Sequence, residues 1–436
     1  MPDKTFDPER PDGTRADVTD RRPPRPNGRI LVIEPDSSAL GVLRAAHAEG
    51  IDVVAVSRNE GDRTLPESIR RFVDELVEVE TNDEPALLAA AGRLHAQRPF
   101  RGVVPGFEFY VDTAARLAAL LGLPGLAPAA AERLRDKALM REAVARAGLR
   151  VPRHQEAHSA EELVRAAGPV GFPAVLKPAA SAGSVHVSRV DDLEGLRRAY
   201  RWMNEDTRTD LGRSLDGRVL LEEYISGPEV SVEGYIADGT PVVLSVTAKQ
   251  LGPEPHFVEV GHTVGTDLAP GTRALVESYV AEVCRALGVT LGPFHCELRL
   301  PEGEPVLIEM AARLAGDRIC DLVELTTGVS LARVMLAAYA GLDPAKAASA
   351  GTVVTRYAAI HFFTAPGLPV LSRIDGWPEL AGCEAVLEAK LHLAPGAEVP
   401  PLEDFRGRIG YVIYRADSFA EAEARRAEFQ RTVCFG

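Results

Sequence analysis

The feature that most limits the possible folds is an alternation of short apolar runs and helical stretches between residues 29 and 106. The apolar runs are RILVIEP (29–35), IDVVAVS (51–57), FVDELVEV (72–79) and GVVPG (102–106). Strands buried on both faces give such runs, and their alternation with helices predicts a parallel, doubly wound sheet. Ligands of these sheets bind beyond the carboxyl ends of the strands, which places Glu34, Ser57 and the loop 105–110 on a ligand-facing rim.

Charge and apolar content exclude several classes of protein. Lys plus Arg number 49 against 63 Asp plus Glu, a net charge of −14, whereas a protein that binds duplex nucleic acid needs a basic face. No apolar run approaches the roughly 18 residues that a membrane span requires, and the N-terminus lacks the apolar core of a signal peptide. The five cysteines are widely spaced, as expected for reduced thiols. We therefore expect a cytoplasmic protein that binds neither nucleic acid nor a membrane.

The remaining sequence divides into segments of different character. Residues 1–27 are rich in charge, Pro and Gly, which predicts a disordered leader. The segment 128–149 indicates two helices, and the order strand–loop–strand–helix–strand at 169–225 indicates a small inserted α/β module. The expected domains are a leader (1–27), a Rossmann-like N-terminal domain (28–126), a helical connection (127–168), a small module (169–238) and a C-terminal domain (239–436) with a strand-rich tail (351–436).

Several widespread catalytic motifs are absent. The dipeptide Gly-Lys does not occur, so the chain has no P-loop, and no G-x-G-x-x-G follows the first predicted strand. The motifs H-E-x-x-H of zincins and G-x-S-x-G of serine hydrolases are missing as well. These absences exclude the commonest nucleotide-binding loops and two large classes of hydrolase.

Two glutamates in a predicted hairpin give the strongest chemical signal. In FHCELRLPEGEPVLIEMAAR (294–313) a turn at Gly303 sets Glu297 opposite Glu309. An unpaired carboxylate within an apolar strand is costly, and two facing carboxylates repel each other unless a cation lies between them. Hard oxygen ligands suit Mg²⁺, which completes its coordination with phosphate oxygens. The alternative is that one or both glutamates point to solvent.

Three lysines occupy positions where phosphate could be bound. Lys177 ends the apolar run AVLKP and precedes a loop of Ala, Ser and Gly, Lys137 begins a helix, and Lys249 ends another apolar strand. Small residues allow the backbone to approach phosphate closely. Each lysine alone is equally compatible with a solvated surface position. The stretch 174–187 is thus either a loop that closes over phosphates or a flexible turn.

An acidic pair offers hydrogen-bond acceptors. Glu222 and Glu223 end the apolar strand RVLLEE, and Glu229 follows the next turn. Such groups suit an adenine amine or a ribose, although a charged edge of a hairpin would have the same sequence.

The order of these residues along the chain, from Lys137 through Lys177, Glu222, Lys249 and Glu297 to Arg313, resembles the ATP-grasp superfamily. It is most similar to the carboxylate–amine ligases that join amino acids, the L-amino acid ligases. The resemblance covers about 29–436. It implies an ATP-grasp fold of class α/β, with an N-terminal doubly wound parallel-sheet domain, a small α/β lid (169–238) and a larger α+β C-terminal domain.

The resemblance implies that ATP lies between the lid and the C-terminal domain. Its expected ligands are Lys137 and Lys177 for the α- and β-phosphates, the amides of Gly183 and Ser184 for the terminal phosphates, Glu222 with the main chain of Glu223, Tyr224 and Ile225 for adenine, Glu229 for the ribose, and Lys249 for the γ-phosphate.

The same resemblance assigns the metal and the catalytic groups. Glu297 and Glu309 would hold two Mg²⁺ ions, for which Mn²⁺ can substitute, and Arg313 would stabilise an acyl phosphate and the tetrahedral intermediate formed from it. Glu309 and Lys249 would join Arg313 as catalytic residues. Many ATP-grasp enzymes have Asn two residues after the second glutamate, whereas Ala311 stands there in this chain. The run E-x-A-A-R is common in the amino-acid ligases, and it removes one side-chain ligand from the second metal.

The implied reaction has two steps. A carboxylate attacks the γ-phosphorus to give an acyl phosphate and ADP, and an amine then attacks the carbonyl and releases phosphate. Both steps require charge neutralisation and exclusion of water. The partners would be small carboxylate and amine substrates, and homodimers are common in this group.

Substrate residues follow from a second motif. Glu259 and His262 form the E-x-G-H arrangement that lines the amino-acid site of this ligase group. The spacing of His256, Glu259 and His262 would also suit zinc, and a solvated loop is a further alternative. Glu108 on the sheet rim and Asp317 beyond Arg313 are candidates for a substrate ammonium group.

Two other functions remain open. The fold could activate a carboxylate for another nucleophile, such as ammonia or a hydroxylamine-like amine, or carry out carboxyphosphate chemistry. Alternatively, the chain could bind ATP without catalysis, although such a protein would be free to lose its metal ligands.

Overall fold

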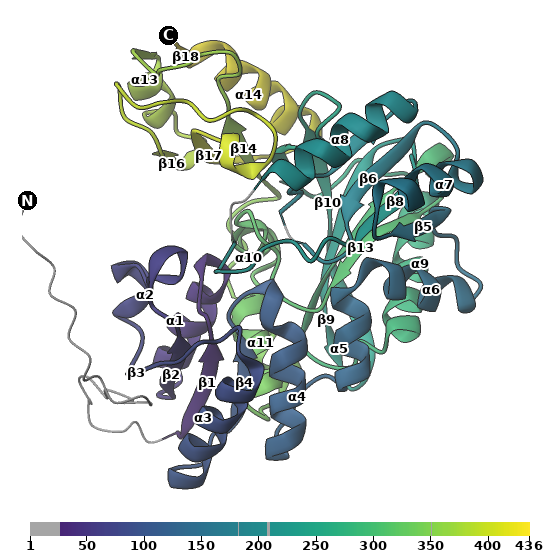
Figure 1. The fold of residues 1–436 in the computed structure, drawn as a ribbon. Helices are drawn as coiled ribbons and strands as arrows, with labels where there is room; N and C mark the ends of the chain where they lie inside the picture. The colour runs from purple at the N-terminus through teal and green to yellow at the C-terminus, as the bar shows by residue number, and fades with distance from the viewer. Residues whose placement is uncertain (1–26, 182, 207–209, 350) are drawn as a thin grey trace, which may run out of the picture.

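The computed structural model describes residues 27–181, 183–206, 210–349 and 351–436. The described residues form three sheets of four or more strands, each in a different part of the molecule, and a two-stranded sheet near the C-terminus (Figure 1). The predicted disordered leader, 1–27, lies outside the described residues except for its last residue.

The N-terminal sheet is parallel with the strand order β3-β2-β1-β4. Helices lie between its strands, so the doubly wound arrangement predicted from the sequence is confirmed. The fully buried β1 shows why its sequence is a continuous apolar run. The elements are β1 (Arg29–Ile33), α1 (Leu40–Ala48), β2 (Asp52–Ser57), α2 (Glu67–Arg70), β3 (Glu75–Glu78), α3 (Glu84–Gln97), β4 (Gly102–Pro105) and α4 (Val111–Leu121).

Two short helices, α5 (Pro128–Arg135) and α6 (Lys137–Arg146), connect this sheet to the rest. Asp136 ends the first helix and caps the second, since its side chain accepts from the amides of Ala138 and Leu139. The cap fixes the start of α6. Lys137 and Arg141, four residues apart, therefore lie on one face of this helix.

The small sheet has the order β5-β8-β6-β7, with helices α7 and α8 in the connections. Strands β6 and β7 form an antiparallel hairpin, so the loop after Lys177 is the turn of a hairpin, as expected. The elements are β5 (His154–Ala157), α7 (Ala160–Val170), β6 (Ala174–Pro178), β7 (Ser188–Val190), α8 (Leu193–Glu205) and β8 (Val219–Glu223).

The large sheet has eight strands in the order β13-β12-β9-β10-β11-β14-β17-β16, and the pairs are antiparallel. Its strands are β9 (Glu229–Ala237), β10 (Thr240–Leu251), β11 (Glu259–Val264), β12 (Pro293–Arg299), β13 (Val306–Ala311), β14 (Tyr357–Phe363), β16 (Val386–Leu391) and β17 (Gly410–Ala416).

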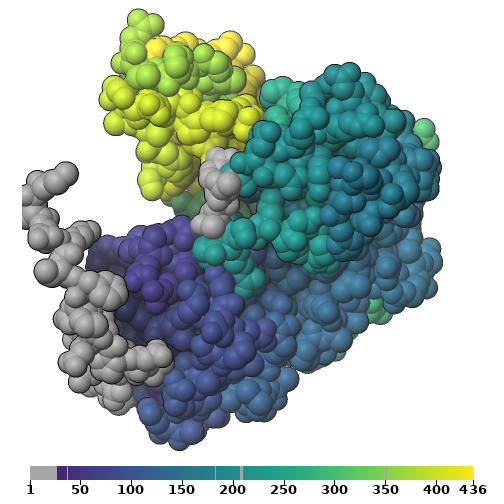
Figure 2. Space-filling view, viewed as in Figure 1, coloured from purple at the N-terminus to yellow at the C-terminus, as the bar shows by residue number. Residues whose placement is uncertain are grey.

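Helices from distant parts of the chain pack on this sheet. One apolar core joins α9 (Pro270–Leu287) to β9, β12 and β13, and another joins α10 (Ile319–Thr327) and α11 (Leu331–Tyr339) to the N-terminal sheet. Helix α12 (Pro344–Ala347) follows α11 and packs on it. The C-terminal module, residues 351–436, adds β15 (Ile374–Asp375), α13 (Trp377–Ala381), α14 (Phe419–Thr432) and β18 (Cys434–Phe435). It is the yellow segment at the top of Figure 2, beside the teal lid.

Sheet membership places the limits of the small module elsewhere than expected. Strand β5 and helix α7, expected within a helical connection (127–168), belong to the small sheet, because β5 pairs with β8. Strand β9, expected in the small module (169–238), pairs with β10 and β12 of the large sheet. The polar strand HQEA at 154–157 has no apolar run, which is why the sequence did not reveal it.

No helix in the described part of the chain is both long and apolar enough to cross a membrane.

Candidate active site

The hairpin of β12 and β13 brings the two predicted metal ligands together. Glu297 and Glu309 are direct cross-strand partners, as the symmetry about Gly303 predicted. A bulge follows at Glu297 and Leu298. Facing carboxylates on adjacent strands lie close enough to share one cation.

One oxygen of each glutamate is already held by the protein. Oε1 of Glu297 accepts from Nζ of Lys249 at 2.6 Å and from Nε2 of His295 at 3.1 Å. Oε1 of Glu309 lies 3.1 Å from Nζ of Lys137. The second oxygen of each has no hydrogen-bond partner among the described residues. Two such oxygens form a donor set that fits Mg²⁺.

His295 and Glu233 continue this network into the sheet. The Nδ1 atom of His295 lies 3.0 Å from Oε1 of Glu233. Burial lowers the pKa of His295, but Glu233 and Glu297 outweigh it and raise the pKa to about 9. At Glu297 burial raises the pKa, but Lys249 and His295 outweigh this effect and lower the pKa to about 2. Both groups are therefore charged at neutral pH.

A second ion cluster joins α6 to the small sheet. Glu222 accepts from Nζ of Lys177 at 2.5 Å and from Nε of Arg141 at 2.9 Å. Burial raises the pKa of Glu222, but Arg141 and Lys177 outweigh it and hold the pKa at about 2. For Lys177 burial dominates, and despite Glu222 the pKa falls to about 8, with Arg141 and Lys137 also lowering it. Only the main chain of Glu222 is left to meet a ligand, because its carboxylate is occupied.

A pocket lies between the small and the large sheet and collects most of the expected nucleotide ligands. It is lined by Lys137, Lys177, Ser184, Glu222, Glu223, Tyr224, Ile225, Glu229, Glu297 and Glu309 of the predicted set. Val175, Ser181, Val187, Phe257, Arg299 and Ile308 complete its wall. The expected ligands of adenine, ribose, phosphate and metal thus face one space.

Arg299 is a pocket residue that the sequence analysis missed. Its Nε donates to Oε2 of Glu229 at 3.0 Å. Its guanidinium lies 5.7 Å from the ring centre of Tyr224 and 5.5 Å from that of Phe257. This wall of the pocket therefore combines two aromatic rings with a guanidinium group.

Three described residues in the turn of the β6–β7 hairpin lie in the left-handed region. Gly183 has φ +68°, and Ser184 and His186 each have φ +57°. A Cβ on Gly183 would come 2.9 Å from the ring of Phe405 in the C-terminal module. Gly183 therefore has both a conformational and a steric reason to lack a side chain, and the turn is close to that module.

Lys249 lies at the centre of three carboxylates. Its Nζ is 3.0 Å from Glu229, 2.6 Å from Glu259 and 2.6 Å from Glu297. Burial lowers its pKa, but the three carboxylates together raise it well above its usual value. Three carboxylates that surround one ammonium group form a site of high negative potential next to the glutamate pair.

The E-x-G-H residues form a cluster with Asp317. Nε2 of the fully buried His262 lies 3.0 Å from Oδ2 of Asp317 and 3.3 Å from Oε2 of Glu259. Arg408 of the C-terminal module donates to Oδ1 of Asp317 at 2.7 Å. Burial lowers the pKa of His262, but Asp317 and Glu259 outweigh it and raise it. Glu259 also contacts Lys249, so this cluster adjoins the glutamate pair.

Glu259, His262 and Asp317 are close enough to hold a metal ion together. The zinc alternative used His256 instead of Asp317. The ring centre of His256 lies 5.1 Å from that of Trp202, and neither of the two groups of described residues that could hold a metal ion, Glu259–His262–Asp317 and Glu229–Glu259–Glu297, includes His256. The zinc-like spacing of His256, Glu259 and His262 therefore predicted a different set of ligands from the cluster in the structure.

Glu108 pairs with arginines in this structure. Its Oε1 accepts from Arg135 at 2.7 Å, and its Oε2 accepts from Nε of Arg313. Burial raises its pKa, but Arg313 and Arg135 outweigh it and hold the pKa at about 2. Both oxygens are occupied, which favours a role for Glu108 in orienting Arg313 over the expected contact with a substrate ammonium group.

Arg141, His295 and Arg408 were missed as well. Arg141 follows Lys137 by four residues on a helix, and His295 precedes Glu297 by two on a strand, so each shares a face with a predicted residue. That spacing was the available signal. Arg408 lies in the C-terminal module, and nothing in the local sequence links it to Asp317.

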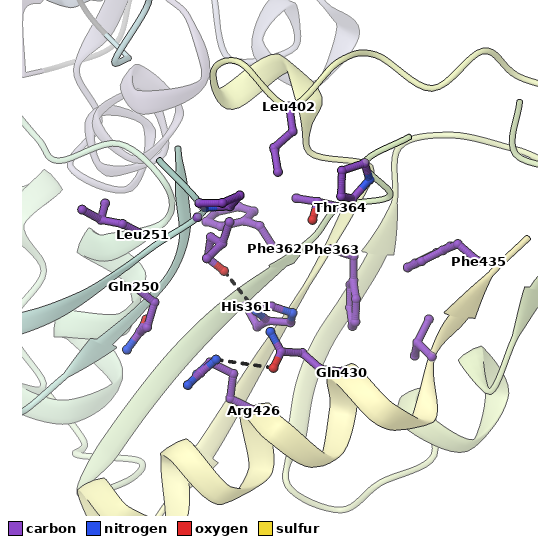
Figure 3. Close-up of a pocket in the computed structure, with 15 residues that line it drawn as sticks. Gln250, Leu251, His361, Phe362, Phe363, Thr364, Leu402, Arg426, Gln430 and Phe435 are labelled. Carbon is purple, nitrogen blue, oxygen red and sulfur yellow. Dashed lines mark hydrogen bonds between the residues drawn. The ribbon is translucent and has the colours of Figure 1, made fainter. Parts of the chain in front are cut away.

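A larger cavity, of about 650 Å³, lies on the other face of the large sheet (Figure 3). Alternate residues of a strand point to opposite faces, so Gln250 points away from the face that carries Lys249. The cavity is lined mainly by apolar side chains, including Phe362, Phe363 and Phe435, and by His361. None of the predicted site residues lines it.

Three family models match successive parts of the chain. The ATP-grasp N-terminal domain matches residues 43–125, the ATP-grasp domain matches 170–321, and the L-amino acid ligase C-terminal domain 2 matches 361–436. The second match spans strands of both the small and the large sheet, and the third contains β16 and β17 of the large sheet.

Similar proteins include the uncharacterized protein y4rH of Sinorhizobium fredii, 31% identical over 355 residues that cover 80% of this chain and 71% of that protein. Alanine–anticapsin ligase of Bacillus subtilis is 26% identical over 247 residues, about half of each chain (52% and 52%).

Among solved structures, the crystal structure of L-amino acid ligase from Bacillus licheniformis superposes with a TM-score of 0.79 at 25% identity, covering 94% of this chain and 99% of that chain. The resemblance seen in the sequence and the expected fold class are confirmed. The chain belongs to the ATP-grasp superfamily of ATP-dependent ligases and carries the C-terminal domain of its L-amino acid ligases.

Proposed function

We propose that the protein activates the carboxylate of one amino acid as an acyl phosphate and couples it to the amine of a second, with formation of ADP and phosphate. The observation that carries this proposal is the position of Lys249. Its ammonium group contacts both Glu297 of the glutamate pair and Glu259 of the cluster that includes His262. Glu297, which we assign to the metal and nucleotide, and Glu259, which we assign to the substrate, therefore both contact Nζ of Lys249. Phosphoryl transfer requires the γ-phosphate and the substrate carboxylate to lie next to each other in the same way.

ATP-grasp enzymes use ATP and Mg²⁺, and the pocket between the sheets supports a nucleotide in this chain. Lys137 and Lys177 line one part of it, and Tyr224, Ile225 and Arg299 line another. We assign the first group to phosphates and the second to adenine and ribose. Glu297 and Glu309 would hold one or two Mg²⁺ ions, or Mn²⁺, which neutralise charge on the transferred phosphoryl group.

Arg313 is the proposed electrophilic group of the second step. Burial lowers its pKa, but Glu108, Glu309 and Glu297 outweigh it and raise it, so it remains cationic. A fixed guanidinium stabilises the oxyanion that forms when the amine attacks the acyl phosphate. Glu108 would hold Arg313 in this orientation.

The substrate cluster supports an amino acid as the substrate. Glu259 and Asp317 are carboxylates that can accept from an ammonium group, and His262 and Arg408 are donors that can bind a carboxylate. The two kinds of group lie within one cluster, as recognition of a zwitterion requires. Alanine–anticapsin ligase, one of the relatives, is by its name a ligase of the amino acid alanine.

The test is a measurement of phosphate release with ATP and Mg²⁺ across amino acids supplied singly and in pairs, with mass spectrometry of the products. We expect release that depends on a pair and a product that is the pair minus one water molecule. Ammonia and bicarbonate serve as separate arms. Release with one of these and no amino acid would favour the other nucleophiles, and AMP with pyrophosphate would exclude an acyl phosphate.

A further inference from the structure

A fully buried carboxylate lies in the middle of the large sheet, on β9, where the proposed reaction does not use it. Glu233 is 0% exposed. Its Oε1 accepts from Ser231 at 2.6 Å and from His295 at 3.0 Å, and its Oε2 accepts from Ser245 at 2.9 Å and Thr247 at 2.5 Å. Four donors from three strands satisfy both of its oxygens, so the carboxylate has one fixed orientation.

His295 transmits this orientation to the glutamate pair. It is the cross-strand partner of Glu233, and its other nitrogen lies 3.1 Å from Oε1 of Glu297, two residues further along β12. Both ring nitrogens face carboxylate oxygens, so both must donate. The ring is held at both ends and cannot turn without losing a bond to a buried charge.

Lys249 also donates to Oε1 of Glu297, but its side chain is more mobile than the ring of His295 and has other partners. Its ammonium group ends a flexible stem and is shared with Glu229 and Glu259. Under the proposed function it turns towards the γ-phosphate. His295 is then the donor that stays on Glu297.

We propose that Glu233 and His295 are positioning residues that hold Oε1 of Glu297 on the protein side and keep Oε2 directed at a divalent cation. The proposal rests on the proposed function, because it takes Glu297 as a metal ligand. Partners behind a metal-binding side chain commonly set its direction, and their loss weakens metal binding.

A purely structural pair is the competing explanation. A buried ion pair is a weak source of stability, since apolar residues of the same volume do as well or better. Here three hydroxyl side chains, Ser231, Ser245 and Thr247, donate to one buried carboxylate, and among the described residues its only ion-pair partner is His295, which also contacts Glu297. These hydrogen bonds are explained if the reaction requires a fixed position of Glu297.

The experiment measures binding of Mn²⁺ to the full chain in the presence of ADP, by electron paramagnetic resonance of free Mn²⁺. The variants are His295→Gln, His295→Phe and Glu233→Gln, with Glu297→Gln as reference. We expect Mn²⁺ affinity to fall about 10-fold or more in the His295 variants, with Phe the weaker binder because Gln keeps one donor. Affinity for ADP in EDTA is expected to stay within about twofold of wild type, because no metal is involved.

Ser245→Ala is the matched control. It removes one hydrogen bond from Glu233 on the side away from His295. We expect a loss of thermal stability similar to that of Glu233→Gln, with Mn²⁺ affinity within about twofold of wild type, because Thr247 still donates to the same oxygen and the contact with His295 is kept.

The outcomes separate this inference from the proposed function. If the His295 and Glu233 variants unfold at lower temperature but bind Mn²⁺ as wild type does, the pair is structural and the inference is wrong. If wild type binds no Mn²⁺ with ADP, or Glu297→Gln binds it equally well, the metal assignment fails first and the inference with it. Should His295→Phe not fold, His295→Gln and Glu233→Gln decide.

Discussion

Two buried histidines on neighbouring strands show how the two faces of the large sheet differ. His262 on β11 is 0% exposed and His361 on β14 is 3% exposed. In the register of these strands His361 lies opposite Gly261, and His262 lies opposite Ile360, so the two rings point to opposite faces. Their pKa values are shifted in opposite directions.

The neighbours of each ring account for the difference. Burial lowers the pKa of both, but Asp317 and Glu259 more than compensate at His262. At His361 burial and Arg426 lower the pKa to about 4, and the hydrogen bond to the carbonyl of Val260 compensates only in part. Similar burial is therefore compatible with opposite pKa shifts, and the ring of His361 is neutral at neutral pH.

The contrast indicates what each face of the sheet can do. The face with His262 also carries Lys249, Glu297 and Glu233, and its charges are paired with one another. The face with His361 is covered by α14 and surrounds an apolar cavity (Figure 3). The first face gathers the lysine and carboxylates that can neutralise phosphate and metal, so we expect changes on the two faces to have different consequences.

Glu309→Ala on the charged face is expected to have the largest effect. It removes one of the two carboxylates that face each other across the hairpin, and Lys137 loses its contact with Glu309. Loss of metal stabilisation of several kcal/mol corresponds to a fall in kcat/KM of about 1000-fold. The measurement is ATP- and substrate-dependent phosphate release.

Gln430→Ala is the control on the other face, where Gln430 lines the apolar cavity. We expect its activity to stay within about twofold of wild type, since the change removes no group from the charged face. Full activity in Glu309→Ala, or an equal loss in the two variants, would contradict the functional difference between the faces.

The next largest effect is on stability as a function of pH. The pKa of His361 falls from 6.5 to about 4 on folding. Below pH 6.5 the unfolded chain gains a proton that the folded chain does not, so stability is lost as the pH falls from 6.5 to 4. The loss amounts to roughly 3 kcal/mol, and His361→Gln should remove it. Chemical denaturation at pH 7, 5.5 and 4.5 measures it.

His262→Gln should change the slope in the other direction. A histidine whose pKa is raised on folding contributes stability that is present below the unfolded pKa and lost as the pH rises through the folded pKa. The variant therefore loses more stability at pH 6 than at pH 8. Parallel slopes for the two variants would refute the opposite directions of the two pKa shifts.

Much of this fold could be predicted because periodicity is a local property. The buried run at β1 identified a parallel sheet, and the positions of Glu297 and Glu309 around Gly303 set their pairing. Strand β5 was missed because its residues are polar and its place in the small sheet depends on pairing with β8, over sixty residues away. Local sequence does not encode such a pairing.

The same limit applies to the site. The residue types of Lys177, Lys249 and Glu222 pointed to nucleotide chemistry, but their partners did not follow from them. Arg141 reaches Glu222 from a separate helix, and Arg408 reaches Asp317 from the C-terminal module. Glu108 was expected to be available to a substrate and is instead held by two arginines. Charge states depend on these distant partners.

Lys177 and Lys249, like the two histidines, are buried side chains whose pKa values are shifted in opposite directions. Both ammonium groups are buried. Three carboxylates raise the pKa of Lys249 against the effect of burial, whereas Lys177 has one carboxylate, Glu222, which it shares with Arg141. Burial therefore dominates at Lys177, and its pKa falls to about 8.

The smallest effect we predict follows from this pKa. Above pH 8 Lys177 is increasingly neutral in the free protein, and the phosphates of ATP favour its charged form, so binding of ATP must take up a proton there. The dissociation constant is expected to rise by up to about tenfold per pH unit above pH 8, or roughly 1.4 kcal/mol. Calorimetry between pH 7 and 9.5, in buffers of different ionisation enthalpy, measures both affinity and proton uptake. Lys177→Met should bind more weakly but without this pH dependence, because Lys249 stays charged throughout the range. A constant affinity for wild type across pH 8 would show that the carboxylate of Glu222, rather than burial, determines the charge of Lys177.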